Sequence, residues 1–402
     1  ATLKELRGRM PDCHLVLENG VVCSGQPFGA AADAVFELVF NTSMTGYQEI
    51  ITDPSYRGQG VLFTVSHIGN VGINLEDDES AAPQVSAVVT RSLSPVVSNW
   101  RAGRDLSGWL AEHGVPGISG VDTRYLTRLL RDRGTMKAAL STQGTDPAGL
   151  LAMARAWPGL DGVDMVKAVT CMEPYPWMGD AGDRWVLVVG EKGGETPPLR
   201  DDAAGRGGVS PPSASAHVVL YDFGAKRNIM RHLAAAGLRV TVVPADTLAA
   251  QVLAMQPAGV MLSNGPGDPA GLPYAVEATR QLIDANVPIF GICLGHQLIG
   301  RALGGTTSRL KFGHHGGNHP VQDLRTGAVV ITAQNHNYQV DMASLDPAEV
   351  EITHVSLNDG SLEGMRLKHK PVFCVQYHPE AAPGPHDAHG LFGEFLKLLC
   401  AQ

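Results

Sequence analysis

The sequence lacks the features that mark several classes of protein. No apolar run approaches the roughly 18 residues that a membrane-spanning helix needs, and no charged segment followed by a hydrophobic one stands at the N-terminus. The formal net charge is −9 and the isoelectric point is near 5.9, so the chain has no basic excess with which to neutralise a phosphate backbone. We therefore expect a cytoplasmic protein that binds neither nucleic acid nor membrane.

Cysteine spacings typical of disulfide frameworks or metal sites are also missing. The six cysteines form no CxxC pair, which favours reduced thiols in a reducing compartment. A free cysteine in a folded protein usually acts as a small buried hydrophobic residue, so each must be judged by its surroundings. The cysteines stand at positions 13, 23, 171, 293, 374 and 400.

The composition is that of a folded chain with one interruption. Of the 402 residues, 44% are hydrophobic and 18% are charged, which is ordinary for two or three globular domains. Residues 191–215 contain five glycines, four prolines and three serines, too little apolar surface to offset the entropy of ordering them. We predict a flexible linker at 191–215 between an N-terminal domain, 1–190, and a C-terminal domain, 216–402.

The C-terminal domain alternates short apolar stretches with helix-like stretches. This alternation is typical of an α/β fold with a mostly parallel sheet flanked by helices, in which ligands bind at the carboxyl ends of the strands. Strands are predicted at 217–224, 238–245 and 287–292, and a strand running into a loop at 259–269. Helices are predicted at 225–237, 247–257, 274–286 and from about 296 to 303.

The N-terminal domain is less regular. Asn19-Gly20 predicts a hairpin turn, residues 36–40 and 86–90 resemble strands, and Asp122 is placed to cap a helix that follows it. These features predict a mixed α/β domain. The four arginines of the helix after Asp122 are explained by a solvated helix face.

The segment "GICLGHQ" places Cys293 between an apolar stretch and a helix-like one. Gly291 and Gly295 would let the backbone bend sharply around it, as in a nucleophile elbow. A thiol at a helix N-terminus is favoured as thiolate, and the N–H of Leu294 would face an oxyanion beside the sulfur. A buried packing cysteine explains this segment alone equally well.

A partner for Cys293 follows another apolar stretch. Pro379 disfavours helix for His378, and in an extended chain residues two apart face the same way, so His378 and Glu380 would project together. A cysteine, a histidine and a carboxylate could then form a catalytic triad. A third strand end, "SNGPGDP", supplies Gly265 and Gly267, whose main-chain N–H groups a ligand could approach.

These segments resemble a known family. "SNGPGDP", "GICLGHQ" and "QYHPEA" are similar, in this order, to the signatures of class I, triad-type glutamine amidotransferase domains. "FNTSMTGYQEI", "HIGNVGIN", "YDFGAKRN", "KFGHHGGNHPV" and "AQNH" resemble the small, glutamine-hydrolysing chains of carbamoyl-phosphate synthetases. The similarity covers the chain from about His14 to its last predicted helix, apart from the linker.

The resemblance implies a role for each matching residue. Cys293 would attack the side-chain amide of glutamine to give a γ-glutamyl thioester and ammonia, His378 would act as general base and acid, and Glu380 would orient it. The N–H groups of Leu294 and Gly265 match the oxyanion hole. The positions that match those holding glutamine are Ser43, Gly265, Gly267, Leu294, Gln297, Asn335, Asn337 and Tyr338. Asn337 and Tyr377 stand where the family commonly has glycine.

The resemblance also implies a partner. The chain contains no Walker motif, so it is not expected to activate phosphate itself. The implied partner is the large synthetase chain, which would use ATP, magnesium and bicarbonate to make carbamoyl phosphate for arginine and pyrimidine synthesis, with the N-terminal domain as docking surface. No cofactor is expected on this chain.

Other functions fit parts of the sequence. A free-standing cysteine hydrolase of similar fold would need only the elbow and the triad, and a binding subunit would carry a vestigial triad. The segment "HHGGNH" could supply His314, His315 and His319 to a metal, but no cysteine or carboxylate stands beside it at ligand spacing. We expect a tight turn there, with histidines hydrogen-bonded to neighbours, and no metal.

Overall fold

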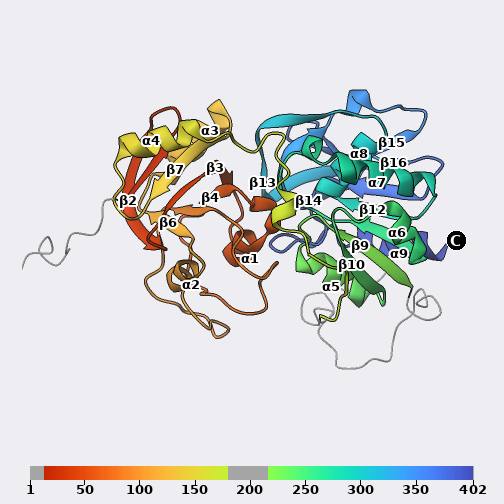
Figure 1. Ribbon diagram of the computed structural model, residues 1–402, viewed down its shortest axis with the longest axis horizontal. Coiled ribbons are helices and arrows are strands. Elements are labelled where there is room, and N and C mark those ends of the chain that lie inside the picture. The colour runs from red at the N-terminus through yellow and green to blue at the C-terminus, as the bar shows by residue number, and fades with distance from the viewer. Residues whose placement is uncertain (1–12, 180–215, 402) are drawn as a thin grey trace, which may run out of the picture.

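The computed structural model describes residues 13–179 and 216–401. They form two domains that lie side by side, one built around a closed barrel and the other around a ten-stranded sheet (Figure 1). The predicted linker, 191–215, lies outside the described residues. Among the helices of the described part, none combines the length and the apolar character that crossing a bilayer requires.

Seven strands of the N-terminal domain close into a barrel in the order β1-β2-β6-β5-β4-β3-β7. The predicted hairpin is confirmed, because β1 and β2 pair antiparallel and Gly20 takes a φ of 90° at the turn. The strands are β1 (Cys13–Leu17), β2 (Val22–Gly29), β3 (Asp33–Asn41), β4 (Gln59–Phe63), β5 (Ala87–Thr90), β6 (Pro116–Ser119) and β7 (Met136–Ser141).

Helices pack around this barrel. The predicted cap of α3 is confirmed, since the Asp122 side chain accepts a hydrogen bond of 2.9 Å from the N–H of Tyr125, and the helix buries Leu126 and Leu130 in the barrel core. The α-helices are α1 (Tyr47–Thr52), α2 (Leu106–Glu112), α3 (Thr123–Arg133) and α4 (Pro147–Ala156), with the 3₁₀ turn η1 (Pro54–Tyr56). The 3₁₀ turn η2 (Val166–Ala168) follows α4 in the chain but buries Val166 in the core of the C-terminal domain.

The C-terminal domain contains the second sheet, in the order β14-β13-β15-β16-β17-β12-β11-β9-β10-β8. Its centre, from β17 to β10, is parallel as predicted, and antiparallel strands extend both edges. The strands are β8 (Tyr175–Pro176), β9 (His217–Asp222), β10 (Arg239–Pro244), β11 (Gly259–Leu262), β12 (Ile289–Ile292), β13 (Thr307–Asp323), β14 (Val329–Val340), β15 (Val350–Ser356), β16 (Leu362–Leu367) and β17 (Val372–Val375).

Helices cover both faces of this sheet. In β9, Val219 and Tyr221 join one apolar core with α6, α7 and α8, whereas Val218 and Leu220 join a second core with α5 and α9. Burial on both faces explains why the parallel strands are almost continuously apolar. The helices are α5 (Arg227–Ala235), α6 (Ala249–Ala254), α7 (Pro273–Asp284), α8 (Leu294–Ala302) and α9 (Gly390–Cys400), with 3₁₀ turns η3 (Pro269–Gly271) and η4 (Met342–Ser344).

The start of α8 and the course of β13 differ from the sequence-based predictions. Helix α8 begins at Leu294 instead of about His296, because the turn at Cys293 is completed within one residue. The segment "HHGGNH" is not a tight turn but part of β13, which pairs with β14 through two register shifts. The paired glycines therefore accommodate an irregular strand.

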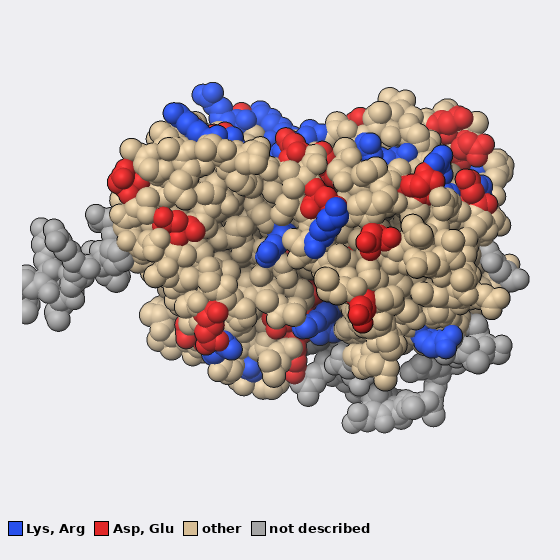
Figure 2. All heavy atoms as spheres, in the orientation of Figure 1, with Lys and Arg blue, Asp and Glu red and all other residues tan. Residues whose placement is uncertain are grey.

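The surface charge is unevenly distributed over the face in view. Figure 2 shows lysine and arginine side chains gathered along the edge of the N-terminal domain that carries α3 and α4. The exposed arginines of α3 are Arg124, Arg128, Arg131 and Arg133.

Candidate active site

The three strand ends predicted to carry the site belong to neighbouring strands of the sheet. Strands β17, β12 and β11 are adjacent and parallel, so the segments that follow them emerge at one edge of the sheet. The N-terminal domain reaches this edge through Asp53, whose carboxylate accepts hydrogen bonds from Asn335 at 2.9 Å and Asn264 at 3.4 Å. The site therefore lies where the two domains meet.

Cys293 occupies the sharp turn between β12 and α8. Its φ of 53° and ψ of −101° are unusual for a residue with a side chain. A Cβ atom at Gly295 would lie 2.3 Å from the carbonyl oxygen of Leu262, and one at Gly291 would lie 2.7 Å from Ile299. The predicted elbow geometry is confirmed, and it requires glycine on both sides of the cysteine.

His378 and Glu380 face each other after β17, across a turn at 379–380 and not along the extended chain that was predicted. His378 Nδ1 lies 2.6 Å from Glu380 Oε1, and the two side chains are 2% and 0% exposed. Burial alone would lower the pKa of His378, but the charges of Glu380 and of the Cys293 sulfur raise it to about 10. Burial alone would raise the pKa of Glu380, but Lys226 and His378 lower it to about 2. Glu380 is therefore a carboxylate that favours an imidazolium.

The Cys293 sulfur lies in a polar pocket beside this imidazole. The thiol contacts the Asn335 carbonyl oxygen at 3.6 Å, and Gln376 Nε2 donates to the sulfur at 3.6 Å. The sulfur raises the pKa of His378, and within the described part of the chain no other side chain or backbone group forms a hydrogen bond with His378 Nε2. The imidazole can therefore exchange a proton at Nε2.

One cavity collects most of the predicted substrate-binding residues. Its lining includes Cys293 and six of those residues, namely Gly265, Gly267, Gln297, Asn335, Asn337 and Tyr338. Leu294 is not part of the lining, but a Cβ at Gly265 would lie 2.8 Å from its side chain, so the two predicted oxyanion positions are neighbours. Ser43 also lies outside the lining, buried beside Gly317.

The side-chain amides of Asn335 and Asn337 are held by the protein. Asn335 Nδ2 donates to Asp53, and Asn337 Nδ2 donates to Glu37 at 3.0 Å. Their Oδ1 atoms each lie 3.0 Å from a ring nitrogen of His315. In this arrangement both carboxamides brace the cavity wall.

Sequence reasoning missed several lining residues. Glu37 in β3 and Arg309 in β13 form an ion pair at the cavity, and the Arg309 guanidinium lies 5.7 Å from the centre of the Tyr338 ring. Burial raises the pKa of Glu37 although Arg309 opposes the rise. The signal in the sequence that could have indicated Glu37 was a charged residue within the apolar stretch "FELVF". The other lining residues not predicted are Ser55, Gln59, Leu160, His315 and His336.

The predicted histidine segment contributes to a second cluster. Ring nitrogens of His314 and His336 and a carboxylate oxygen of Glu363 lie within 4.8 Å of one another, close enough to share an ion. Both nitrogens of His336, however, already contact oxygens of other residues. His314 Nε2 lies 2.9 Å from Asp359, and although burial alone would lower the pKa of His314, the two carboxylates raise it to about 9. The cluster thus suits an imidazolium between carboxylates.

Two family models match separate regions of the chain. Residues 219–398 match the family model of class-I glutamine amidotransferases, so the C-terminal domain is a glutamine amidotransferase domain. Residues 15–140 match the CPSase domain of the carbamoyl-phosphate synthase small chain.

Similarity to individual proteins covers nearly the whole chain. The carbamoyl phosphate synthase small chain of Escherichia coli strain K12 is 49% identical over 387 residues, which are 96% of each chain. The chloroplastic small chain of Oryza sativa subsp. japonica is 48% identical over 392 residues, 97% of this chain and 83% of that one. The chain belongs to the family of carbamoyl phosphate synthase small chains.

Proposed function

We propose that this chain hydrolyses glutamine to glutamate and ammonia through Cys293, His378 and Glu380. The observation that carries the proposal is the strained turn at Cys293, which holds the sulfur in the same cavity as Gly265, at the end of a strand that pairs with β17, the strand that precedes the buried His378–Glu380 pair. A side-chain amide in this cavity would lie between a nucleophile and a proton donor.

The reaction follows from these positions. The Cys293 thiolate attacks the amide carbon of glutamine, and the N–H groups of Leu294 and Gly265 stabilise the negative oxygen that forms. His378 gives a proton from Nε2 to the leaving nitrogen, so the C–N bond breaks and ammonia departs from a γ-glutamyl thioester. The neutral imidazole then takes a proton from water, whose oxygen attacks the thioester carbon, so the C–S bond breaks and glutamate and the Cys293 thiolate are released beside the imidazolium.

The rest of the cavity suits the amino acid end of glutamine. Glu37 offers a carboxylate to an ammonium group and Arg309 offers a guanidinium to a carboxylate, although each is paired with the other in the absence of ligand. Gln297, whose Nε2 donates to the Tyr338 carbonyl oxygen at 2.8 Å, holds the backbone of Tyr338 at the cavity wall. Gly267, Ser43, Asn335, Asn337 and Tyr338 complete the proposed glutamine site.

The ammonia would pass to a second chain. We propose the large chain of carbamoyl phosphate synthase as partner, with ATP, magnesium and bicarbonate used on that chain and the N-terminal domain as docking surface. The exposed arginines of α3 make an acidic partner surface suitable. Six free cysteines fit a reducing compartment, and we propose the cytoplasm.

A glutaminase assay with a matched thiol control tests the proposal. Glutamate and ammonia are measured for the wild type, Cys293→Ala and Cys400→Ser, each alone and with the large chain. Cys400 serves as the control because its thiol is exposed and is not part of the cavity lining. We expect equimolar products from the wild type and Cys400→Ser and none from Cys293→Ala. Product release by Cys293→Ala would contradict the proposal, and cleavage of peptides in place of glutamine would favour a free-standing hydrolase.

A further inference from the structure

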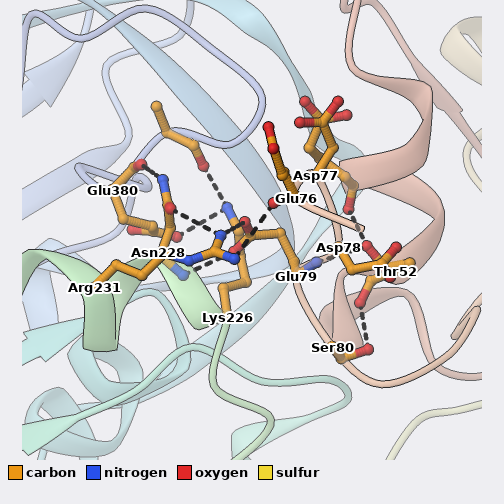
Figure 3. Close-up of polar contacts among 12 residues, drawn as sticks. Thr52, Glu76, Asp77, Asp78, Glu79, Ser80, Lys226, Asn228, Arg231 and Glu380 are labelled. Carbon is orange, nitrogen blue, oxygen red and sulfur yellow. Dashed lines mark hydrogen bonds and ion pairs between the residues drawn. The ribbon is translucent and has the colours of Figure 1, made fainter. Parts of the chain in front are cut away.

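A loop of the N-terminal domain contacts the first turn of α5. The backbone carbonyl of Glu79 accepts a hydrogen bond of 3.0 Å from Arg227 N–H. The Glu79 Oε2 atom accepts one of 3.1 Å from Asn228 N–H, and Figure 3 shows these two residues near Lys226 and Glu380. Thr52 fixes this loop through two hydrogen bonds. Its Oγ1 accepts one of 2.9 Å from Glu79 N–H, and its carbonyl oxygen accepts one of 2.7 Å from Ser80 Oγ. Glu79 is therefore fixed at a helix start that belongs to the other domain.

The same helix turn holds the acid of the triad. Lys226 Nζ lies 3.0 Å from Glu380 Oε1 and donates to the carbonyl of Ala381, and Asn228 Nδ2 donates to the Glu380 carbonyl at 3.0 Å. The oxygen that Lys226 contacts is the one that His378 Nδ1 contacts. The orientation of the imidazole thus depends on Lys226 as well as on Glu380.

These charges have almost no access to water. Glu79, Lys226 and Glu380 are 1%, 2% and 0% exposed. Burial alone would lower the pKa of Lys226, but the surrounding carboxylates, first that of Glu380, raise it above its ordinary value. A buried charge that loses a partner is strongly destabilised, so removing one carboxylate would disturb the position of the ammonium.

We propose that Glu79 is a positioning residue for glutamine hydrolysis, through which the N-terminal domain holds Lys226 against Glu380 and thereby fixes the His378 imidazole. This inference rests on the proposed function. Glu79 is not part of the cavity lining, so it acts through α5 and not by touching substrate. The N-terminal domain thereby affects the triad as well as the cavity wall.

The ionisation of Glu79 follows from the groups that face it. These are Lys226 and Arg231 from α5, with Arg231 Nη1 at 3.8 Å, Glu380 from the segment after β17, and Glu49 from α1. Burial raises the pKa of Glu79 to about 7, Lys226 and Arg231 oppose the rise, and Glu380 adds to it. Loss of the Glu79 charge should therefore change how the triad responds to pH.

Three substitutions in one loop test the inference. Glu79→Gln keeps the size and the acceptor for Asn228 N–H but removes the charge, Glu79→Ala removes both, and Glu76→Gln changes a half-exposed carboxylate three residues away. Glutamine hydrolysis is measured from pH 6 to 9, together with the rate at which iodoacetamide alkylates Cys293. Circular dichroism confirms that each variant is folded.

We expect kcat of Glu79→Ala to fall about 100-fold, the size of effect that misplacement by about 1 Å produces, with KM for glutamine nearly unchanged. Glu79→Gln should lose less activity and shift the pH profiles of hydrolysis and alkylation, and Glu76→Gln should match the wild type. Wild-type kcat and pH profiles in both Glu79 variants would overturn the inference. A wild type that does not hydrolyse glutamine would instead contradict the proposed function, while the alkylation profile would still test the role of Glu79.

Discussion

His378 Nδ1 donates to Glu380 Oε1 across 2.6 Å, and neither side chain has significant contact with water. A hydrogen bond at Nδ1 leaves Nε2 as the atom that can exchange a proton with sulfur, leaving group or water. The pair therefore sets both the orientation and the protonation of the base. The extended His-Pro-Glu segment predicted from the sequence is wrong, because Pro379 and Glu380 form a turn in which the Ala381 N–H donates to the His378 carbonyl at 3.1 Å.

Glu380→Gln should nearly abolish turnover. The amide keeps the shape of the side chain but loses the charge that favours the imidazolium, and an equivalent change in a serine triad lowers kcat about 10⁴-fold. The measurement is steady-state glutaminase activity, with the partly exposed Glu351→Gln as control. An unchanged kcat for Glu380→Gln would contradict the assigned role.

Glu79 should make the free energy of unfolding fall as pH rises. Its pKa is raised from 4.5 to about 7 in the folded state, so between these values the folded chain binds more protons than the unfolded chain. The protonated Glu79 carboxyl therefore contributes to the free energy of unfolding below about pH 4.5. This contribution, on the order of 3 kcal/mol, is lost by about pH 7. Urea unfolding of the wild type and of Glu79→Gln at several pH values measures this dependence. Free energies of unfolding that change with pH in the same way for both proteins would refute the prediction.

Gly265→Ala should reduce kcat. A Cβ there would lie 2.2 Å from the carbonyl oxygen of Phe223, so the loop must shift and its N–H must leave the oxyanion position. Loss of one such donor costs about 10²- to 10³-fold in kcat. Gly393→Ala is the control, because a Cβ at this exposed position in α9 meets nothing within 4 Å. Equal activities of the two variants would argue against an oxyanion role for Gly265.

Arg309→Gln should weaken glutamine binding more than turnover. The substitution removes the guanidinium proposed to face the substrate carboxylate, an interaction present in both ground and transition states, so KM should rise about tenfold or more with a smaller change in kcat. Arg325→Gln is a matched control, since Arg325 pairs with Asp323 and Glu394 outside the cavity. The two steady-state parameters are compared, and a loss confined to kcat would count against this role.

Local patterns in the sequence were sufficient for the alternating helices and strands and for the triad candidates. The bend at Cys293 is encoded by its two glycines, whereas His378 and Glu380 meet across a turn and not along the extended chain that the proline predicted. The parallel strands were visible because burial on both faces makes them apolar throughout.

Long-range pairings were beyond sequence reasoning. Glu37 and Arg309 meet although they are far apart in the chain, as do Glu79 and the start of α5. A single buried charge looks like a solvated one in sequence, because its partner cannot be read from its neighbours. The irregular strand β13 was misjudged for a related reason: its glycine pair indicates a turn unless the strand that it pairs with is known.

The most direct test of the account is a search for the covalent intermediate. Enzyme and glutamine are mixed, quenched in acid within one turnover, digested and analysed by mass spectrometry. The account predicts a γ-glutamyl group on the Cys293 peptide of the wild type and none on Cys293→Ala. Glutamate formed at the wild-type rate with no adduct on Cys293 at any quench time, or formed equally by Cys293→Ala, would contradict it.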